Sequence, residues 1–174
     1  ALPVVWRWLK PYQQKRLLVF LDPSLDPLGA GYHLIQSKIA IGSGQVWGKG
    51  LFQGTQNALQ FLPMQHTDFV FAVIGEELGF VGTVGVLGLF WVYLIRGLQA
   101  AQRTPEAFGR LVGVGIVSTV GFHVLVNVGM TVGVMPVTGI PLPFLSHGGS
   151  ALLVNLAATG ILLHLGRRRS WSGP

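Results

Sequence analysis

The chain has 174 residues, of which half are hydrophobic and only 10% are charged. Because soluble domains carry roughly 25% charged residues, this composition excludes an ordinary water-soluble fold and predicts an all-α polytopic integral membrane protein. The chain has no cysteine, which excludes disulfides and cysteine-bearing zinc or redox sites, and its net charge of +6 favours anionic partners. It begins at Ala1 without a sequence resembling a signal peptide, so we expect a piece of a longer protein or a processed one.

The first predicted region, residues 1–68, is a large structured loop outside the membrane. Its apolar runs are far shorter than the roughly 20 residues that a spanning helix needs. Turn signals interrupt it at Gly42-Ser43-Gly44 and at two Asp-Pro pairs. We therefore expect short helices at the membrane interface within this loop.

Three apolar stretches follow, and we predict spanning helices at residues 69–96, 111–134 and 150–166. The loop at 97–110 and the tail at 167–174 carry arginines close to the span ends. The positive-inside rule therefore places both on the cytoplasmic side and the large loop outside. Glycines at regular spacing in the first span indicate close helix packing (Gly79, Gly82, Gly85 and Gly88).

The segment from Pro136 to Ser150 (PVTGIPLPFLSHGGS) interrupts the longest stretch without a charged side chain. Backbone outside a helix is tolerated at membrane depth only where protein or a water-filled cavity covers it. We therefore predict an outer, re-entrant Pro/Gly turn at residues 135–149 that shapes part of a cavity. Ser146 and His147 resemble a nucleophile and a base, but adjacent residues seldom align for that chemistry and no Asp follows them, which disfavours a hydrolase.

Several polar side chains stand in or near the predicted spans. Asp68 suits two roles, an N-cap of the first span or a functional group at its mouth. Glu76 and Glu77 follow eight and nine residues later, about 12–13 Å further along a helix, where a carboxylate needs either an interior ion pair or a functional partner. His123 and Asn127 lie one turn apart in the second span, and we expect them to hydrogen-bond to neighbouring helices.

The glycine-rich run from Gly42 to Gly50 invites comparison with a phosphate-binding loop. The comparison fails, because three residues instead of four separate Gly44 from Gly48, and Gly50 stands where a magnesium ligand is required. Lys49 still has two interpretations, a point charge that approaches a phosphate or a solvated loop lysine. The five histidines show no spacing typical of metal ligands, so no metal site is predicted.

Together these segments resemble the SEDS family (shape, elongation, division and sporulation), and its RodA branch in particular. The resemblance covers nearly the whole chain and rests on residues 21–44, 48–50 and 61–82 and on a signature near the C-terminal end. The signature positions are Asn127, Gly133, Pro136, Gly139, Ile140, Phe144, Leu145, Ser146, Gly148, Gly149 and Ser150. Two residues depart from the family pattern, because His147 replaces an aromatic or small residue and Met64 replaces a polar one.

The resemblance implies a ten-helix membrane protein of which this chain is the C-terminal part, with a large extracellular loop followed by spans eight to ten. It also implies a peptidoglycan glycosyltransferase that polymerises lipid II at the outer face of the cytoplasmic (inner) membrane during cell elongation. The expected partners are lipid II, polyprenyl-diphosphate-linked glycan, membrane lipids and a class B penicillin-binding protein that acts as transpeptidase, with no nucleic acid.

The family's essential acid falls on Asp68. Joining a sugar 4-hydroxyl to an anomeric carbon that carries a diphosphate needs one general base, because the diphosphate leaves without a proton donor. We therefore expect Asp68 to deprotonate the acceptor hydroxyl, with inversion at the anomeric carbon. Lys49, together with Lys38 or a basic residue of 7–16, is expected to neutralise the diphosphate. Further expected substrate contacts are His66, Thr67, Glu77, Ser146, Gly148 and Gly149. The sequence leaves metal dependence open, with magnesium or manganese as the candidate cofactor.

Two other functions fit the same residues. Broken helices near residues 136–150 and the interior Glu76 and Glu77 are typical of a transporter or flippase for lipid-linked precursors. A non-catalytic membrane scaffold would likewise use its spans to recruit partner proteins. Reconstituted protein with lipid II already on the accessible leaflet separates these functions, because only the transferase forms polymer there.

Overall fold

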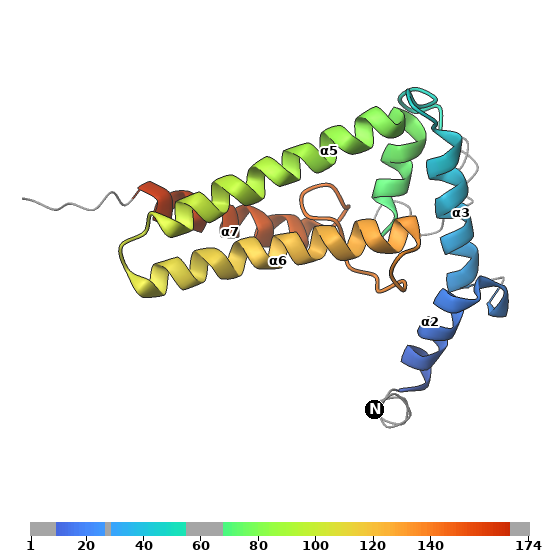
Figure 1. The fold of residues 1–174 in the computed structure, drawn as a ribbon, viewed down its shortest axis with the longest axis horizontal. Helices are drawn as coiled ribbons and strands as arrows, with labels where there is room; N and C mark the ends of the chain where they lie inside the picture. Colours follow the sequence, from blue (N-terminus) through green and yellow to red (C-terminus); the bar gives the residue numbers. More distant parts are fainter. Residues whose placement is uncertain (1–9, 27–28, 55–67, 168–174) are drawn as a thin grey trace, which may run out of the picture.

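The computed structural model describes residues 10–26, 29–54 and 68–167. Within these ranges every regular element is helical, which confirms the predicted all-α class. The elements are α2 (Pro11–Leu21), the short 3-10 helix η1 (Pro23–Leu25), α3 (Ala30–Ser43), α5 (Val70–Gln102), α6 (Ala107–Val132) and α7 (Gly149–Arg167) (Figure 1).

Three of these helices, α5, α6 and α7, are long and apolar enough to cross a membrane. Large hydrophobic side chains stay exposed on all three, among them Leu89, Trp91, Leu125 and Leu153. An exposed apolar surface of this kind requires lipid or further helices around it. The chain is therefore a multi-pass membrane protein, as its composition predicts.

The helices α5 and α6 lie side by side along much of their length, and α7 packs against both (Figure 1). Small residues permit close packing, since a Cβ atom added to Gly113 would lie 2.7 Å from the Cβ atom of Ala101. The hydroxyl groups of Tyr93 and Thr159 lie 2.9 Å apart and join α5 to α7 by a hydrogen bond. The main core cluster consists of Phe71, Phe90, Val120, Val124 and Leu142.

The connection between α5 and α6 is shorter than the sequence predicts. The predicted span ends at position 96, but α5 continues to Gln102, because an arginine does not interrupt a helix and the residues that follow it, such as Leu98 and Ala100, are strong helix formers. The connection is therefore residues 103–106 rather than 97–110.

The Pro/Gly turn occupies residues 133–148, between α6 and α7, close to the predicted 135–149. The helix α6 ends at Val132 because Gly133 takes the left-handed conformation, with φ 81° and ψ 31°. Three prolines in the segment, which lack a peptide N–H, prevent the helix from resuming until Gly149. We refer to residues 133–148 as the signature turn.

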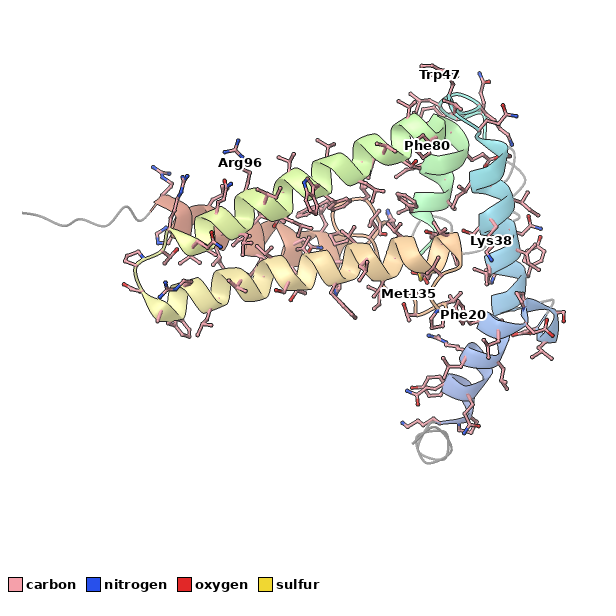
Figure 2. The ribbon with its side chains drawn as sticks, in the orientation of Figure 1. Phe20, Lys38, Trp47, Phe80, Arg96 and Met135 are labelled. Carbon is pink, nitrogen blue, oxygen red and sulfur yellow. The ribbon has the colours of Figure 1, made fainter. Side chains whose placement is uncertain are left out.

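At one end of the long helices lie α3 and the beginning of α5, and α2 contacts α3 and extends away from the long helices (Figure 1). The helix α5 bends at Gly79, and we call residues 70–78 its outer segment. Figure 1 shows the outer segment beside α3 and across the direction of α6. Trp47 and Phe80 lie together at the bend (Figure 2). The straight part of α5 after the bend, residues 80–102, is about 34 Å long, which matches the thickness of a bilayer.

Candidate functional site

The bend in α5 interrupts the helix, and the loop after α3 supplies the missing backbone partners. Four hydrogen bonds join the loop to the two sides of the bend: Lys49 N to Glu76 O and Gly50 N to Glu77 O, each 3.0 Å, Phe80 N to Gln45 O, 2.9 Å, and Val81 N to Val46 O, 3.1 Å. Backbone groups at a broken helix must find other partners when they are shielded from water. The loop from Gly44 to Gly54 therefore stabilises the bend.

Two glycines allow the loop and the helix to approach so closely. Gly79 has φ 66° and ψ −161°, a conformation that is essentially restricted to glycine. A Cβ atom added to Gly79 would lie 2.3 Å from the nitrogen of Gly48, and one added to Gly48 would lie 2.2 Å from the carbonyl oxygen of Glu77. The glycines that invite comparison with a phosphate-binding loop thus serve the contact between loop and helix.

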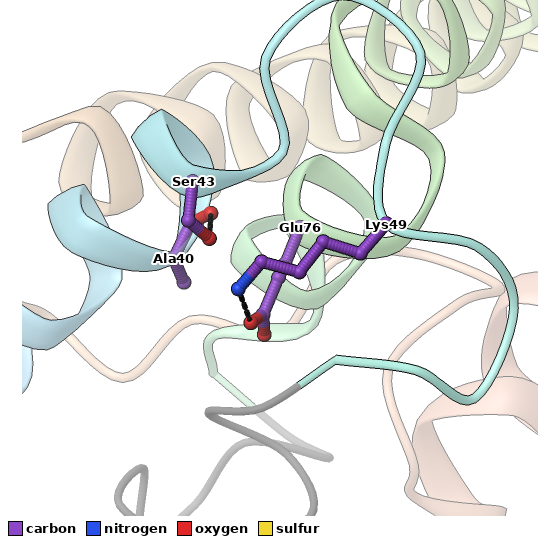
Figure 3. A network of polar contacts seen from close by, with 4 residues as sticks. All are labelled: Ala40, Ser43, Lys49 and Glu76. Atoms are coloured by element: carbon purple, nitrogen blue, oxygen red, sulfur yellow. Dashed lines mark hydrogen bonds and ion pairs between the residues drawn. The ribbon is translucent and has the colours of Figure 1, made fainter.

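Lys49 forms an ion pair with Glu76 across this contact, with 2.7 Å between Nζ and Oε1 (Figure 3). The side chain of Glu76 is 0% exposed, whereas that of Lys49 remains 29% exposed. Because a buried carboxylate without a counter-charge is costly, the lysine stabilises the ionised form of Glu76. Of the two interpretations open for Glu76, the structure shows the interior ion pair.

Replacing Lys49 by methionine is expected to lower the free energy of unfolding by about 3 kcal/mol, because breaking a buried pair costs ~3–5 kcal/mol and Lys49 is partly exposed. The double variant Lys49→Met/Glu76→Gln should recover most of this loss, since it leaves no buried charge. Thermal unfolding of the purified protein in detergent compares the two. A double variant no more stable than Lys49→Met would contradict the ion-pair assignment, and Lys38→Met, at an exposed position on α3, serves as the control.

Asp68 immediately precedes α5, and its side chain is half-buried. The residue at the N-cap position of α5 is Phe69, and no side chain in the described residues caps this helix end. The capping interpretation of Asp68 is therefore wrong, and its carboxylate is not used to begin the helix.

The signature turn lies directly against Asp68. The side-chain amide of Asn127, on α6, donates to the carbonyl of Asp68 at 3.0 Å and to the carbonyl of Ile140 at 2.8 Å. A Cβ atom added to Gly139 would lie 3.4 Å from Oδ2 of Asp68. The turn thus forms a wall beside the carboxylate, with a glycine at the point of closest approach.

A groove of about 390 Å³ opens next to this wall. It is lined by Val70, Leu145, Ser146, His147, Gly148, Gly149 and Leu152. Val70 is two residues from Asp68, so the groove borders the start of α5. The hydroxyl of Ser146 accepts a 2.7 Å hydrogen bond from the peptide N–H of Leu142, which holds the fold of the turn that shapes the groove.

The predicted site residues therefore fall into separate places. Three of them line the groove that Val70 also lines: Ser146, Gly148 and Gly149. Lys49 and Glu77 lie at the opposite end of the outer segment, about 13 Å of helix away from Asp68. His66 and Thr67 lie outside the described residues. Within the described residues no group of three His, Asp or Glu side chains could hold a metal ion, and the metal dependence stays open.

A basic side chain reaches the signature turn from α2. Nη1 of Arg16 donates to the carbonyl of Thr138 at 3.1 Å, and Thr138 adjoins the glycine that faces Asp68. The sequence includes Arg16 only within a range of basic residues, 7–16, that could neutralise the diphosphate, and it marks Asn127 as a signature position rather than as a site residue. The signal for Asn127 is its amide in an apolar span, which needs an internal partner, whereas nothing in the sequence pairs Arg16 with a turn so distant in the chain.

A family model described as "Cell cycle protein", of the FtsW, RodA and SpoVE type, matches residues 1–170. The chain belongs to this family. FtsW/RodA/SpoVE membership confirms the SEDS resemblance on which the assignment of Asp68 rests.

The chain is similar to individual proteins of the FtsW/RodA/SpoVE type. The chain is 50% identical over 169 residues to the peptidoglycan glycosyltransferase MrdB of Escherichia coli K12, covering 97% of this chain and 46% of that protein. It is 48% identical over 163 residues to the peptidoglycan glycosyltransferase RodA of Treponema pallidum, covering 94% and 38%. It is also 47% identical over 157 residues to the stage V sporulation protein E of Bacillus subtilis, covering 90% and 43%.

A solved structure shares the fold. It is described as "Structural coordination of polymerization and crosslinking by a peptidoglycan synthase complex", and one of its chains matches with a TM-score of 0.73 and 41% identity, covering 96% of this chain and 45% of that chain. The present chain thus spans less than half the length of the relatives it matches.

Proposed function

We propose that the complete protein is a peptidoglycan glycosyltransferase that polymerises lipid II into glycan strands at the outer face of the cytoplasmic membrane, for cell elongation and shape. Relatives 50% and 48% identical to this chain carry the name peptidoglycan glycosyltransferase. The observation that carries the proposal is the setting of Asp68. Its carboxylate does not cap α5 and faces Gly139 of the signature turn, and Val70, two residues further on, lines a groove.

The chemistry requires one base and one source of positive charge. Asp68 takes the proton of an acceptor 4-hydroxyl as the oxygen attacks the anomeric carbon, and the polyprenyl diphosphate leaves with its bonding electrons. Attack opposite the leaving group inverts the anomeric carbon. The groove lined by Ser146, Gly148 and Gly149 gives the sugar a place next to the base.

Two basic side chains, Lys49 and Arg16, are the candidates to supply positive charge for the diphosphate. Lys49 is paired with Glu76, so its predicted contact with the diphosphate requires the phosphate to replace the carboxylate as its partner. Arg16 is bound to the turn beside Asp68 and reaches the site without giving up an ion pair with a described residue.

A class B penicillin-binding protein is the proposed partner, and it supplies the crosslinking activity. The support is the solved structure with the same fold, which is described as a complex for polymerisation and crosslinking. The proposed location is the inner membrane, with the lipid-linked substrate at its outer face.

The test is polymerisation of labelled lipid II by the complete protein with its partner, in detergent or in vesicles that carry lipid II on the accessible leaflet. We expect glycan strands to form without any transfer of lipid between leaflets. Transfer of lipid II across the bilayer without polymer would instead identify a flippase. Absence of both activities would identify a scaffold.

A further inference from the structure

Asn127 is fully buried on α6, and its side-chain amide connects two segments that are distant in sequence. Nδ2 donates to the carbonyl of Asp68 at 3.0 Å and to the carbonyl of Ile140 at 2.8 Å, so both amide hydrogens are used. Oδ1 receives no hydrogen bond from the described residues. The side chain therefore acts here as a double donor.

Both accepting carbonyls belong to backbone that is not helical. Such backbone has no regular ladder of hydrogen bonds to fix its position, so individual side-chain contacts determine where it lies. Asn127 stands on a regular turn of α6, where its own carbonyl accepts a 3.0 Å hydrogen bond from the hydroxyl of the buried Thr131. Asn127 thus joins the start of α5 to the signature turn by hydrogen bonds, beside the apolar packing of Phe69 and Val137 between the same two segments.

The placement of the Asp68 carboxylate depends on the separation between the start of α5 and the signature turn. Oδ2 of Asp68 faces Gly139, the residue just before Ile140, whose carbonyl Asn127 binds. A general base acts only within about 2.6–3.2 Å of the hydroxyl whose proton it takes. Because a displacement of about 1 Å can reduce turnover ~100-fold, the amide of Asn127 controls a distance on which the reaction depends.

We propose that Asn127 is a positioning residue for Asp68: its side-chain amide holds the Asp68 peptide against the signature turn and thereby fixes the general base relative to the acceptor site. This inference rests on the proposed function. Asn127 itself touches neither substrate nor reacting atoms, and its effect passes through the peptide of Asp68.

The experiment uses the complete protein with its penicillin-binding partner and two substitutions of similar size: Asn127→Leu removes both donors, and Asn127→Asp leaves at most one, the hydroxyl of a protonated carboxyl group. Asn155→Leu on α7 is the matched control, because its Nδ2 donates within its own helix to the carbonyl of Ala151. Binding of labelled lipid II counts the folded sites in each preparation. Turnover is then expressed per binding site, and KM for lipid II is measured alongside.

We expect turnover per site to fall about 10- to 100-fold in an Asn127 variant that binds lipid II, with KM within twofold of the wild-type value and Asn155→Leu unchanged. A merely structural role would lower the number of binding sites and leave turnover per site intact, which would overturn the inference. Loss of lipid II binding by both variants would overturn it too. The proposed function itself fails if the wild-type protein forms no polymer or if Asp68→Asn remains fully active. These results differ from the two that would overturn only the positioning role of Asn127.

Discussion

The substitution Asp68→Asn is expected to abolish glycan polymerisation by the complete protein while leaving it folded. Asparagine keeps the shape of the side chain and the backbone contact with Asn127, but it cannot accept the proton of the acceptor hydroxyl. Loss of a general base lowers rates by roughly 10²–10⁴-fold, which takes strand formation below detection in a gel of labelled lipid II products.

Asp22, an aspartate outside the candidate site, provides the control. Asp22 is exposed, and hydrogen bonds from the hydroxyl and the peptide N–H of Ser24, at 2.6 and 3.0 Å, hold its pKa below the usual value. Asp22→Asn removes a carboxylate outside the candidate site and should leave polymerisation intact. Wild-type product from Asp68→Asn would refute the assignment of the base.

Replacing Gly79 by alanine is expected to destabilise the protein by about 3 kcal/mol or more. The backbone conformation of Gly79 costs a residue with a side chain roughly 1–3 kcal/mol. In addition, the new Cβ atom would lie 2.3 Å from the nitrogen of Gly48, so the loop must move away and its hydrogen bonds to the bend weaken. Each such bond contributes about 0.5–1.5 kcal/mol. Thermal unfolding in detergent measures the loss.

Gly85→Ala tests whether the effect belongs to the bend rather than to any glycine of the same helix. No heavy atom lies within 4 Å of a Cβ atom added there. Alanine is favoured over glycine inside a helix by about 1 kcal/mol, so Gly85→Ala should be neutral or stabilising. Equal destabilisation by Gly79→Ala and Gly85→Ala would show that the bend does not specifically require glycine.

The long helices were predictable because lipid and backbone impose a simple rule. A run of about 20 apolar residues must become a helix, and the three runs in this chain did so with ends shifted by a few residues. The shifts have local causes. Arginine is a good helix former, so α5 continues past Arg96 to Gln102, whereas Gly133 ends α6 with its left-handed conformation.

The bend at Gly79 was not predictable from the same rule. Gly79 opens a series of glycines spaced by three, and the spacing predicts close helix packing throughout. In the described residues this prediction does not hold for Gly85 and Gly88, where an added Cβ atom would meet nothing within 4 Å. Only the loop distinguishes Gly79 from the others, because Gly48 occupies the space that a side chain would need. The pairing of Lys49 with Glu76 follows from the same docking, and 27 positions of sequence separate the two residues.

The candidate site was predictable in its parts and not in its assembly. The resemblance assigned Asp68, and the helix-breaking composition marked the signature turn as a shaped feature. No sequence pattern joined the two, since the link is the side-chain amide of Asn127, on a third segment, which binds a backbone carbonyl of each. Contacts from side chain to backbone leave little trace in the pattern of residue types.

The bend also affects how the chain enters the bilayer during synthesis. Glu76 and Glu77 both precede it, and the run offered for insertion, residues 80–102, contains Arg96 as its one charged residue. A carboxylate near the middle of an inserting helix costs about 2.5–3.5 kcal/mol, a cost that this arrangement avoids. Insertion of residues 80–102 into lipid thus does not require Glu76 to enter the bilayer. Glu76 is buried separately, when the loop from Gly44 to Gly54 docks against the bend.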